Sequence, residues 1–292
     1  MTRVLAAAVL AGSLGGGAAA GVLPRANPHA TRTVVIHYVA HDGVTRAAYL
    51  LLPGWYTPER DPPLPLVISP HGRGINARAN ARLWGGLPGR DGFAVVNPEG
   101  QGRKLEFYSW GDPGQISDLA RMPTLVERAL PWLHVDRRHI YAVGGSMGGQ
   151  ETLLLVARFP RLLAGAISFD APTNLARRYR DFERMTFGER LQELARYEVG
   201  GSPSRDPRAW ARRSPLDFAR AIARSDVPLE IWWSVSDGVI RDEREESGLL
   251  YREIERLNPR APVMQFVGSW RHCFEFRAYS KLPKALAFLG LN

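Results

Sequence analysis

The sequence predicts an α/β domain built on a mostly parallel sheet of eight strands, with helices on both faces. Short, continuous apolar runs bounded by Gly, Pro or Asp suit strands that are buried on both faces. These runs alternate with amphipathic stretches of helical period, which is the pattern of parallel strands joined by crossover helices. At 292 residues with 45% hydrophobic side chains, the chain is long enough to fill one large core of this kind.

The eight expected strands follow one another in chain order. The first two flank the turn Asp42-Gly43, so we expect them to pair antiparallel as a hairpin. The expected strands are residues 33–39, 46–52, 66–69, 93–97, 140–144, 165–169, 229–235 and 263–267. The expected helices are residues 116–132, 149–158, 242–257 and 279–289.

Residues 171–225 form a segment that is too long for a simple crossover between the sixth and seventh strands. The segment is rich in arginine and contains several aromatic residues, and it suits short helices joined by a loop. Long insertions in α/β enzymes often cover the active site, so we expect a helical lid over the carboxyl edge of the sheet. The alternative is a packing subdomain without a role in substrate choice.

The first 20 residues have the pattern of a signal peptide. Arg3 precedes the apolar run 4–14, and three alanines at 18–20 offer a small-residue cleavage site. We therefore expect residues 1–20 to be a signal peptide, 21–31 a linker and 32–292 the mature domain of a secreted or extracytoplasmic protein. A frayed N-terminal helix of a cytosolic protein is the alternative. No segment has the length and apolar character of a membrane span.

The net charge is +9 and the isoelectric point is about 10.1, and arginine supplies most of the positive charge. Because these arginines are scattered and form no known nucleic-acid module, we expect a solvated basic surface and no nucleic-acid partner. A preference for acidic substrates or polymers is the alternative. Cys273 is the single cysteine, which excludes an intrachain disulfide. We expect it to be a packing residue, with a redox role as the alternative.

The segment Gly144-Gly145-Ser146-Met147-Gly148 fits the pattern G-x-S-x-G. It lies between a predicted buried strand and a predicted helix, and the strand–turn–helix context is what this nucleophile motif requires. Side chains at positions 144 and 148 would collide with neighbouring backbone in such a turn. We therefore predict that Ser146 is a catalytic nucleophile at a helix N-terminus, where unpaired N–H groups favour developing negative charge.

Sites built on this motif place an acid and then a histidine after the serine. His272 is the one histidine of seven that follows Ser146, so we predict that it is the general base. Asp237 follows the seventh strand and is the predicted acid that orients the histidine ring. Asp170, after the sixth strand, is the alternative acid, and Asp242 suits a helix N-cap instead.

An oxyanion hole needs two backbone donors that point at the tetrahedral intermediate. The N–H of Met147, directly after the nucleophile, is the first predicted donor. The second comes from the loop His71-Gly72-Arg73-Gly74 after the third strand, with Arg73 favoured and Gly72 next. We expect His71 to stabilise this loop and not to act as a second base.

Aromatic residues lie in loops near these positions. Phe107, Tyr108 and Trp110 follow the fourth strand, and Trp270 lies beside the histidine. We expect Tyr108, Trp110 and Trp270 to line a substrate pocket, with core packing as the alternative. No H-E-x-x-H or comparable ligand cluster is present, so we expect no metal and no cofactor.

The stretch from Val135 to Tyr141, which leads into the glycine-flanked serine, resembles a stretch of two related sets of proteins. One is the catalytic domains of prolyl-oligopeptidase-like peptidases, and the other is secreted esterases of the feruloyl-esterase and polyhydroxyalkanoate-depolymerase kind. The resemblance implies the α/β-hydrolase fold and acyl-enzyme chemistry without a metal. His139 stands where these proteins often have arginine, which leaves the site untouched.

We therefore expect a secreted serine hydrolase that cleaves a carboxylic ester in a small-molecule or polymer-borne acyl substrate. A prolyl-oligopeptidase-like peptidase that acts on small peptides is the alternative. The chain is too short to carry the β-propeller of the oligopeptidases, which favours the esterase. A non-catalytic binding protein on the same scaffold is the third possibility.

Overall fold

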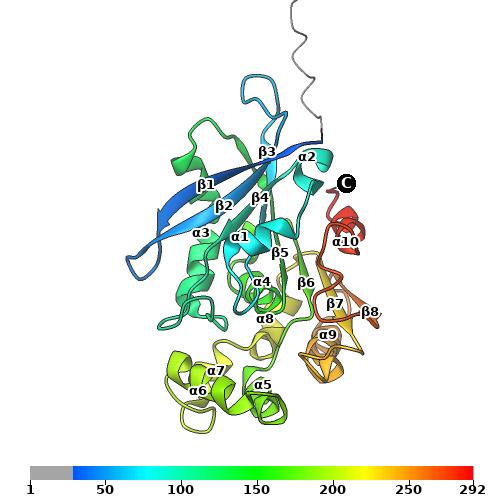
Figure 1. Ribbon diagram of the computed structural model, residues 1–292. Coiled ribbons are helices and arrows are strands. Elements are labelled where there is room, and N and C mark those ends of the chain that lie inside the picture. Colours follow the sequence, from blue (N-terminus) through cyan, green and yellow to red (C-terminus); the bar gives the residue numbers. More distant parts are fainter. Residues whose placement is uncertain (1–28, 292) are drawn as a thin grey trace, which may run out of the picture.

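Eight strands form one sheet in the order β1-β2-β4-β3-β5-β6-β7-β8 (Figure 1). The computed structural model describes residues 29–291, so the predicted signal peptide 1–20 and most of the predicted linker lie outside the described residues. All eight predicted strands are confirmed, with ends that differ by a few residues. The strands are β1 Thr31–Val39, β2 Thr45–Pro53, β3 Leu64–Ile68, β4 Ala94–Pro98, β5 Val135–Gly145, β6 Gly165–Phe169, β7 Leu229–Ser234 and β8 Val263–Gly268.

The sheet is antiparallel at one edge and parallel elsewhere. β1 and β2 pair antiparallel around the Asp42-Gly43 turn as predicted, β2 pairs antiparallel with β4, and every other pair is parallel. From β3 the chain first adds β4 on one side and then β5 on the other. The carboxyl ends of β3 and β5 therefore flank the point where the strand order reverses, which is where open α/β sheets bind ligands.

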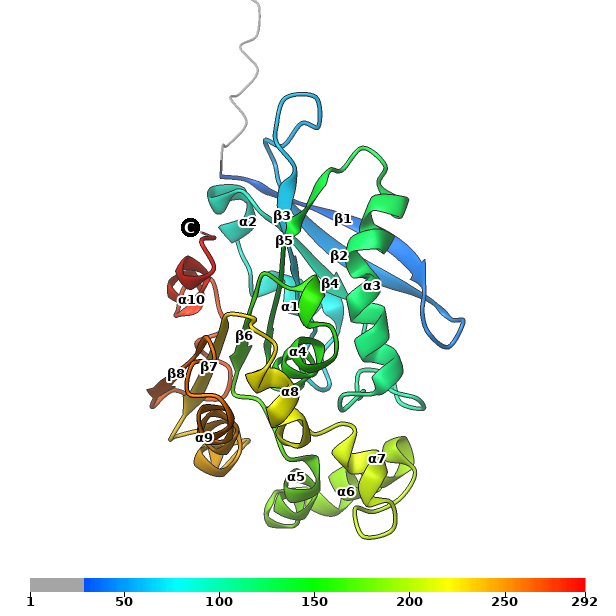
Figure 2. The same cartoon turned by 180° about the vertical axis from the view of Figure 1, so that it is seen from behind.

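Helices cover both faces of the sheet, as predicted (Figures 1 and 2). One face packs on α3 Pro113–Ala129, α4 Met147–Arg158, α8 Ala219–Ala223 and α9 Ser247–Leu257, and the other packs on α1 Ala77–Arg82, α2 Leu87–Asp91 and α10 Leu282–Phe288. Of these, α1, α2 and α8 are absent from the sequence prediction because five or six residues are too few to show a helical period. Within residues 29–291, no helix combines the length and hydropathy needed to cross a membrane.

The start of α9 differs from the prediction. The predicted helix begins at Asp242, whereas α9 begins at Ser247 after a 3-10 turn over Glu243–Glu245. The prediction that Asp242 caps this helix is wrong, because its side chain accepts no capping hydrogen bond. Its carboxylate pairs with the guanidinium of Arg177 at 2.5 Å instead.

The predicted insertion 171–225 divides into two parts. The helices α5 Leu175–Asp181, α6 Gly188–Val199 and α7 Pro207–Ala211 lie together beyond the carboxyl ends of the central strands (Figure 1). Phe182 and Trp210, from this group, share a small apolar core with Trp110 and Met147. By contrast, α8 packs with α4 and α9 against the sheet, so the last part of the segment belongs to the helical layer.

A buried ionic network joins the insertion to the loop after β4. The guanidinium of Arg213 donates to the carbonyl of Ser109, to Asp112 at 2.7 Å and to Glu198 at 3.3 Å. Glu198 also accepts backbone N–H groups of residues 103, 104 and 105 at 2.6–3.0 Å. All three charged side chains are buried, so separating the two segments would expose charges whose partners are then missing.

Glu151 is a buried acid on α4, on the same helix that begins at the nucleophile turn. Its side chain is 1% exposed, and its Oε1 accepts a hydrogen bond from the Ser109 hydroxyl. Burial raises the pKa of this carboxyl to about 8, from an ordinary value of 4.5. The folded protein therefore keeps a proton on Glu151 through the neutral range.

We predict that Glu151→Gln flattens the pH dependence of stability. Between the unfolded pKa and the folded pKa the folded state holds a proton that the unfolded chain releases, so wild-type stability falls as pH rises. The amide cannot ionise, so the variant should gain on the order of 4 kcal/mol in unfolding free energy relative to wild type from pH 5 to pH 8. Urea denaturation at both pH values measures this gain. Glu59→Gln, at an exposed position, is the control, and parallel curves for all three proteins would contradict the prediction.

Candidate active site

Ser146 lies in a sharp turn between the end of β5 and the start of α4. Its backbone has φ 58° and ψ −125°, a conformation that side chains other than glycine rarely adopt and that is often found at functional sites. Its N–H donates to the Phe169 carbonyl at 2.8 Å. A Cβ at Gly144 would come within 2.5 Å of the Gly148 backbone, and one at Gly148 within 2.2 Å of the Pro70 carbonyl oxygen. The turn therefore requires both glycines, as the sequence predicts.

His272 and Asp237 contact each other across the loops that follow β8 and β7. Nδ1 of His272 lies 2.6 Å from Oδ2 of Asp237. The other carboxylate oxygen accepts the N–H groups of Val239 at 2.6 Å and Ile240 at 2.9 Å. A carboxylate partner places the hydrogen on Nδ1 and leaves the lone pair of Nε2 free to accept a proton.

Ser146 and His272 line the same hollow of about 160 Å³, with Gly72, Phe276 and Cys273 also in its wall. No hydrogen bond joins Ser146 Oγ to His272 Nε2 in the structure. The Nε2 atom of His272 lies 3.7 Å from the Cys273 sulfur. The structure thus brings the predicted acid and base into direct contact and puts the serine beside them. Contacts of this kind are often long in enzymes without substrate and shorten when it binds.

The residues that carry the two predicted backbone donors lie next to Ser146, since Met147 follows it in the chain and Arg73 lines the same hollow. Met147 is the first residue of α4, and Arg73 belongs to the loop after β3. Within the described part of the chain, neither backbone N–H donates a hydrogen bond. A methyl group at Gly72, the alternative donor, would lie 3.8 Å from Cβ of Ser146. Both N–H groups therefore remain free for a substrate oxygen.

Buried hydrogen bonds fix the loop that carries Arg73. Nδ1 of His71 donates to the Gly72 carbonyl at 2.8 Å, and Nε2 accepts the Gly100 N–H at 2.9 Å. Burial lowers the pKa of His71, which keeps the ring neutral in this arrangement. Because both ring nitrogens are occupied, His71 holds the loop and has no free nitrogen for a substrate proton.

Asp170, the alternative acid, does not bond to His272. Its Oδ2 accepts the backbone N–H of Cys273 at 2.7 Å. Burial raises the pKa of Asp170 to about 6 and that of its neighbour Glu275 to about 10. Burial also raises the pKa of Glu243 well above its usual range. Glu243 and Glu275 therefore keep their protons, and carry no charge, in the neutral range.

Two groups of three side chains near His272 are close enough together to bind one metal ion. The side-chain donor atoms of Asp170, Asp237 and Glu243 all lie within 4.8 Å of one another, as do those of Asp170, His272 and Cys273. Asp237 already accepts three hydrogen bonds, and burial raises the pKa of the Cys273 thiol well above its usual range. Oδ1 of Asp170 and both carboxyl oxygens of Glu243 are buried without a hydrogen-bond partner among the described residues, and burial raises the pKa of both acids.

A second, smaller hollow of about 20 Å³ lies on another side of Ser146. Of the predicted pocket aromatics, Trp110 lines it, and Tyr108 packs against Trp110 with ring centres 5.7 Å apart. Trp270 lines neither hollow, and its ring packs near Trp232 at 6.1 Å. The remaining lining residues are Arg73, Met147, Pro172, Arg178, Phe182, Val239 and Ile240.

Arg178 and Ile240 are lining residues that sequence analysis does not single out. Ile240 follows the predicted acid by three residues, so its proximity could have been inferred from the turn. Arg178 carries no such signal, because it is one of many arginines in the insertion. Its location depends on how α5 docks over the sheet.

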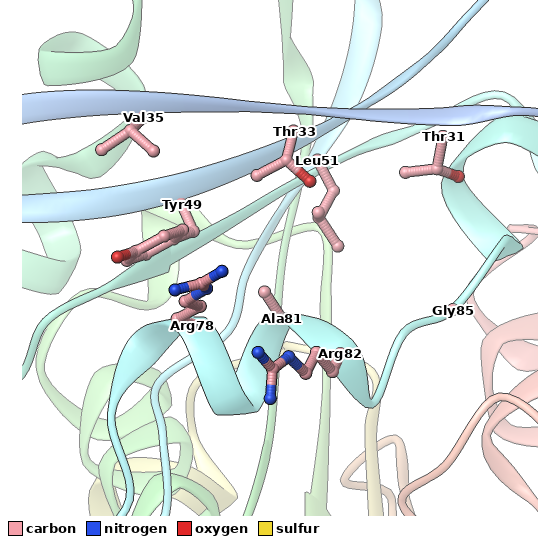
Figure 3. Close-up of a pocket in the computed structure, with 9 residues that line it drawn as sticks. All are labelled: Thr31, Thr33, Val35, Tyr49, Leu51, Arg78, Ala81, Arg82 and Gly85. Carbon is pink, nitrogen blue, oxygen red and sulfur yellow. The ribbon is translucent and has the colours of Figure 1, made fainter.

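A wider hollow of about 580 Å³ lies away from the serine, between the β1–β2 edge and α1 (Figure 3). Thr33 and Tyr49 of the strands face Arg78 and Arg82 of the helix there. Its lining holds no histidine, cysteine or carboxylate, whereas the hollow of about 160 Å³ beside Ser146 includes His272. The hollows beside Ser146 are therefore the candidate site.

Known proteins resemble this chain in sequence and in structure. No protein-family model matches the sequence. The human acylamino-acid-releasing enzyme is 28% identical over 143 residues, which are 47% of this chain and 19% of that enzyme, so the chain spans about a fifth of its length. The acylaminoacyl peptidase of Pyrococcus horikoshii superposes with a TM-score of 0.65 at 15% identity, covering 89% of this chain and 41% of that one. The S-formylglutathione hydrolase of Staphylococcus aureus superposes with a TM-score of 0.64 at 16% identity, covering 90% and 100%.

The chain has the α/β-hydrolase fold. Ser146 lies directly after β5, Asp237 after β7 and His272 after β8, which is the chain order expected from the sequence. The fold predicted from the sequence is therefore confirmed.

We predict that Gly148→Ala destabilises the protein by about 2–3 kcal/mol, because the new methyl group meets the rigid Pro70 carbonyl and forces backbone to move. Gly238→Ala is the matched control, since a Cβ there would meet nothing within 4 Å. Guanidinium denaturation of both variants measures the difference. Equal destabilisation of the two would show that the turn at Ser146 tolerates a side chain.

Proposed function

We propose that the chain is a serine hydrolase that cleaves carboxylic esters, with Ser146 as nucleophile, His272 as general base and Asp237 as the orienting acid. The observation that carries this proposal is the 2.6 Å contact between Asp237 and His272 beside a serine held at φ 58°. Because Asp237 contacts Nδ1 of His272, the Nε2 atom stays available to accept the serine proton. The turn presents the serine hydroxyl at a helix N-terminus.

In this mechanism, Ser146 Oγ attacks the ester carbonyl carbon while His272 Nε2 takes the hydroxyl proton. The carbonyl oxygen becomes an oxyanion that accepts hydrogen bonds from the N–H groups of Met147 and Arg73. Asp237 stabilises the imidazolium that forms. The imidazolium then protonates the leaving alcohol as the C–O bond breaks, and water attacks the acyl-enzyme by the same route to release the acid.

The choice of ester over peptide has support from the solved structures that share the fold, since they include an esterase of Pyrococcus furiosus, which superposes with a TM-score of 0.62 at 16% identity. Peptide cleavage is the second candidate, and the 28% identity to an acylamino-acid-releasing enzyme favours it. Parallel assays of a p-nitrophenyl ester and the corresponding p-nitroanilide distinguish the two activities, because both release a coloured product.

We further propose that residues 1–20 direct export. The support is the sequence pattern alone: Arg3, an apolar run and three alanines at the expected cleavage site. N-terminal sequencing of the protein recovered from culture medium tests this proposal. A mature protein that begins shortly after Ala20 supports export, and a chain that is retained uncleaved inside cells contradicts it.

We predict that Ser146→Ala lowers ester turnover by roughly 10⁴- to 10⁶-fold, because no other hydroxyl can form the acyl-enzyme. The melting temperature should change little, since alanine fits the space of serine. Steady-state kinetics and thermal denaturation measure the two effects. A fluorophosphonate probe should label wild type and not the variant.

The same pair of measurements separates catalysis from a purely binding role for this scaffold. Absence of probe labelling and of turnover in folded wild-type protein would favour the non-catalytic alternative. Full turnover in Ser146→Ala would refute the assignment of the nucleophile.

A further inference from the structure

Two arginines from different parts of the chain converge on the small hollow beside Ser146. Arg73 comes from the loop after β3, and Arg178 comes from α5 in the insertion. Their guanidinium carbons lie 5.7 Å and 5.0 Å from the centre of the same Phe182 ring. Both cations therefore face the space next to the nucleophile.

Neither guanidinium has an anionic partner within residues 29–291. Arg73 makes no side-chain hydrogen bond there, and Arg178 contacts the sulfur of Met185 at 3.6 Å. No carboxylate lies within 4 Å of either one. Arg177, the next residue along the helix from Arg178, shows the usual arrangement, since it pairs with Asp242 at 2.5 Å.

The lack of a partner is costly because Arg178 is buried and Arg73, beside it, is half-buried. Arg178 is 5% exposed, and burial lowers the pKa of both arginines, with the charge of Arg178 lowering that of Arg73 further. Four carboxyl groups act on Arg178 from beyond ion-pair distance, namely those of Glu246, Asp181, Asp237 and Glu243. One oxygen of Glu246 is occupied by the N–H groups of Thr173 and Asn174. Buried charges are normally paired, so this pair has donors to spare for an anion.

We propose that Arg73 and Arg178 bind a carboxylate of the substrate, so that the preferred substrates are esters with a free carboxylate a few atoms from the scissile carbonyl. This inference rests on the proposed function, because Ser146 defines where the scissile bond lies. Guanidinium groups match the two oxygens of a carboxylate. The hollow of about 20 Å³ has room for a group of one or two water molecules in size, which suits a carboxylate better than a bulkier phosphate.

The walls of the hollow strengthen this interaction. Pro172, Val239 and Ile240 provide apolar surface around the two cations. Excluding water lowers the local dielectric response, which makes a charge-assisted hydrogen bond stronger than at the surface. A neutral ester would leave both arginines without a partner in the complex, so the site selects against it.

The test compares monoethyl glutarate, which carries a carboxylate in its acyl part, with neutral diethyl glutarate. A second pair, 4-acetoxybutanoate and butyl acetate, puts the carboxylate in the leaving group. Wild type should show the higher kcat/KM for the anionic member of at least one pair. Arg178→Gln should lower that anionic-to-neutral ratio by about 10- to 100-fold, since a hydrogen bond to a charged group is lost.

Arg180→Gln is the matched control, because Arg180 lies on the same helix and is exposed. It should keep the wild-type ratio. Arg178→Lys retains the charge without the two-pronged geometry, so it should restore part of the preference. If Arg178→Gln does not fold, Arg73→Gln tests the same prediction, since it removes the other guanidinium and leaves the backbone N–H in place.

Binding of free glutarate to Ser146→Ala, measured by calorimetry, tests the arginine pair without catalysis. Adding Arg178→Gln to this variant should abolish detectable binding. A wild-type preference for the neutral esters, or equal ratios in Arg178→Gln and Arg180→Gln, would overturn the inference and leave the serine hydrolase standing. If wild type turns over no ester and the fluorophosphonate probe does not label it, the proposed function is refuted. In that case the calorimetric binding of glutarate still tests whether the two arginines bind a carboxylate.

Discussion

The backbone turn at Ser146 is the constraint on which the rest of the site depends. Gly144 and Gly148 approach backbone so closely that neither can carry a side chain, and this contact holds α4 against the end of β3. The loop with Arg73 and the serine hydroxyl therefore meet at one point. The loops after β7 and β8 then need only bring an acid and a histidine to the same edge of the sheet.

Burial of acids near His272 would weaken this arrangement if every carboxyl were ionised. Asp170, Glu243 and Glu275 lie in the group that surrounds Asp237, and burial raises the pKa of each. Their protonated forms add no negative charge beside Asp237. Two backbone N–H groups and the imidazole all contact the oxygens of Asp237.

The sequence predicts the strands and the fold well because buried parallel strands leave a strong local pattern of apolar runs between turn residues. It also predicts the order of the candidate triad, and the contact between Asp237 and His272 agrees with that prediction, while the catalytic roles remain proposals. The short helices α1, α2 and α8 leave no periodic signal. The positions of Arg178 and Trp270 depend on how the segments pack in three dimensions. Other arginines and tryptophans of the chain lie in different surroundings, so the residue type alone does not predict these positions.

The network around Arg213 has a consequence for how such a protein could change over evolutionary time. The wall of the cleft consists of two stretches about a hundred residues apart, and they share one set of buried charges. Exchanging the helical stretch alone would remove the guanidinium that pairs with Asp112. Exchanging the other stretch alone would remove Asp112 from Arg213 and the three backbone N–H groups from Glu198. New specificities are therefore expected to arise by paired replacement, or by point changes at Arg73, Phe182 and Arg178, which leave the shared charges intact.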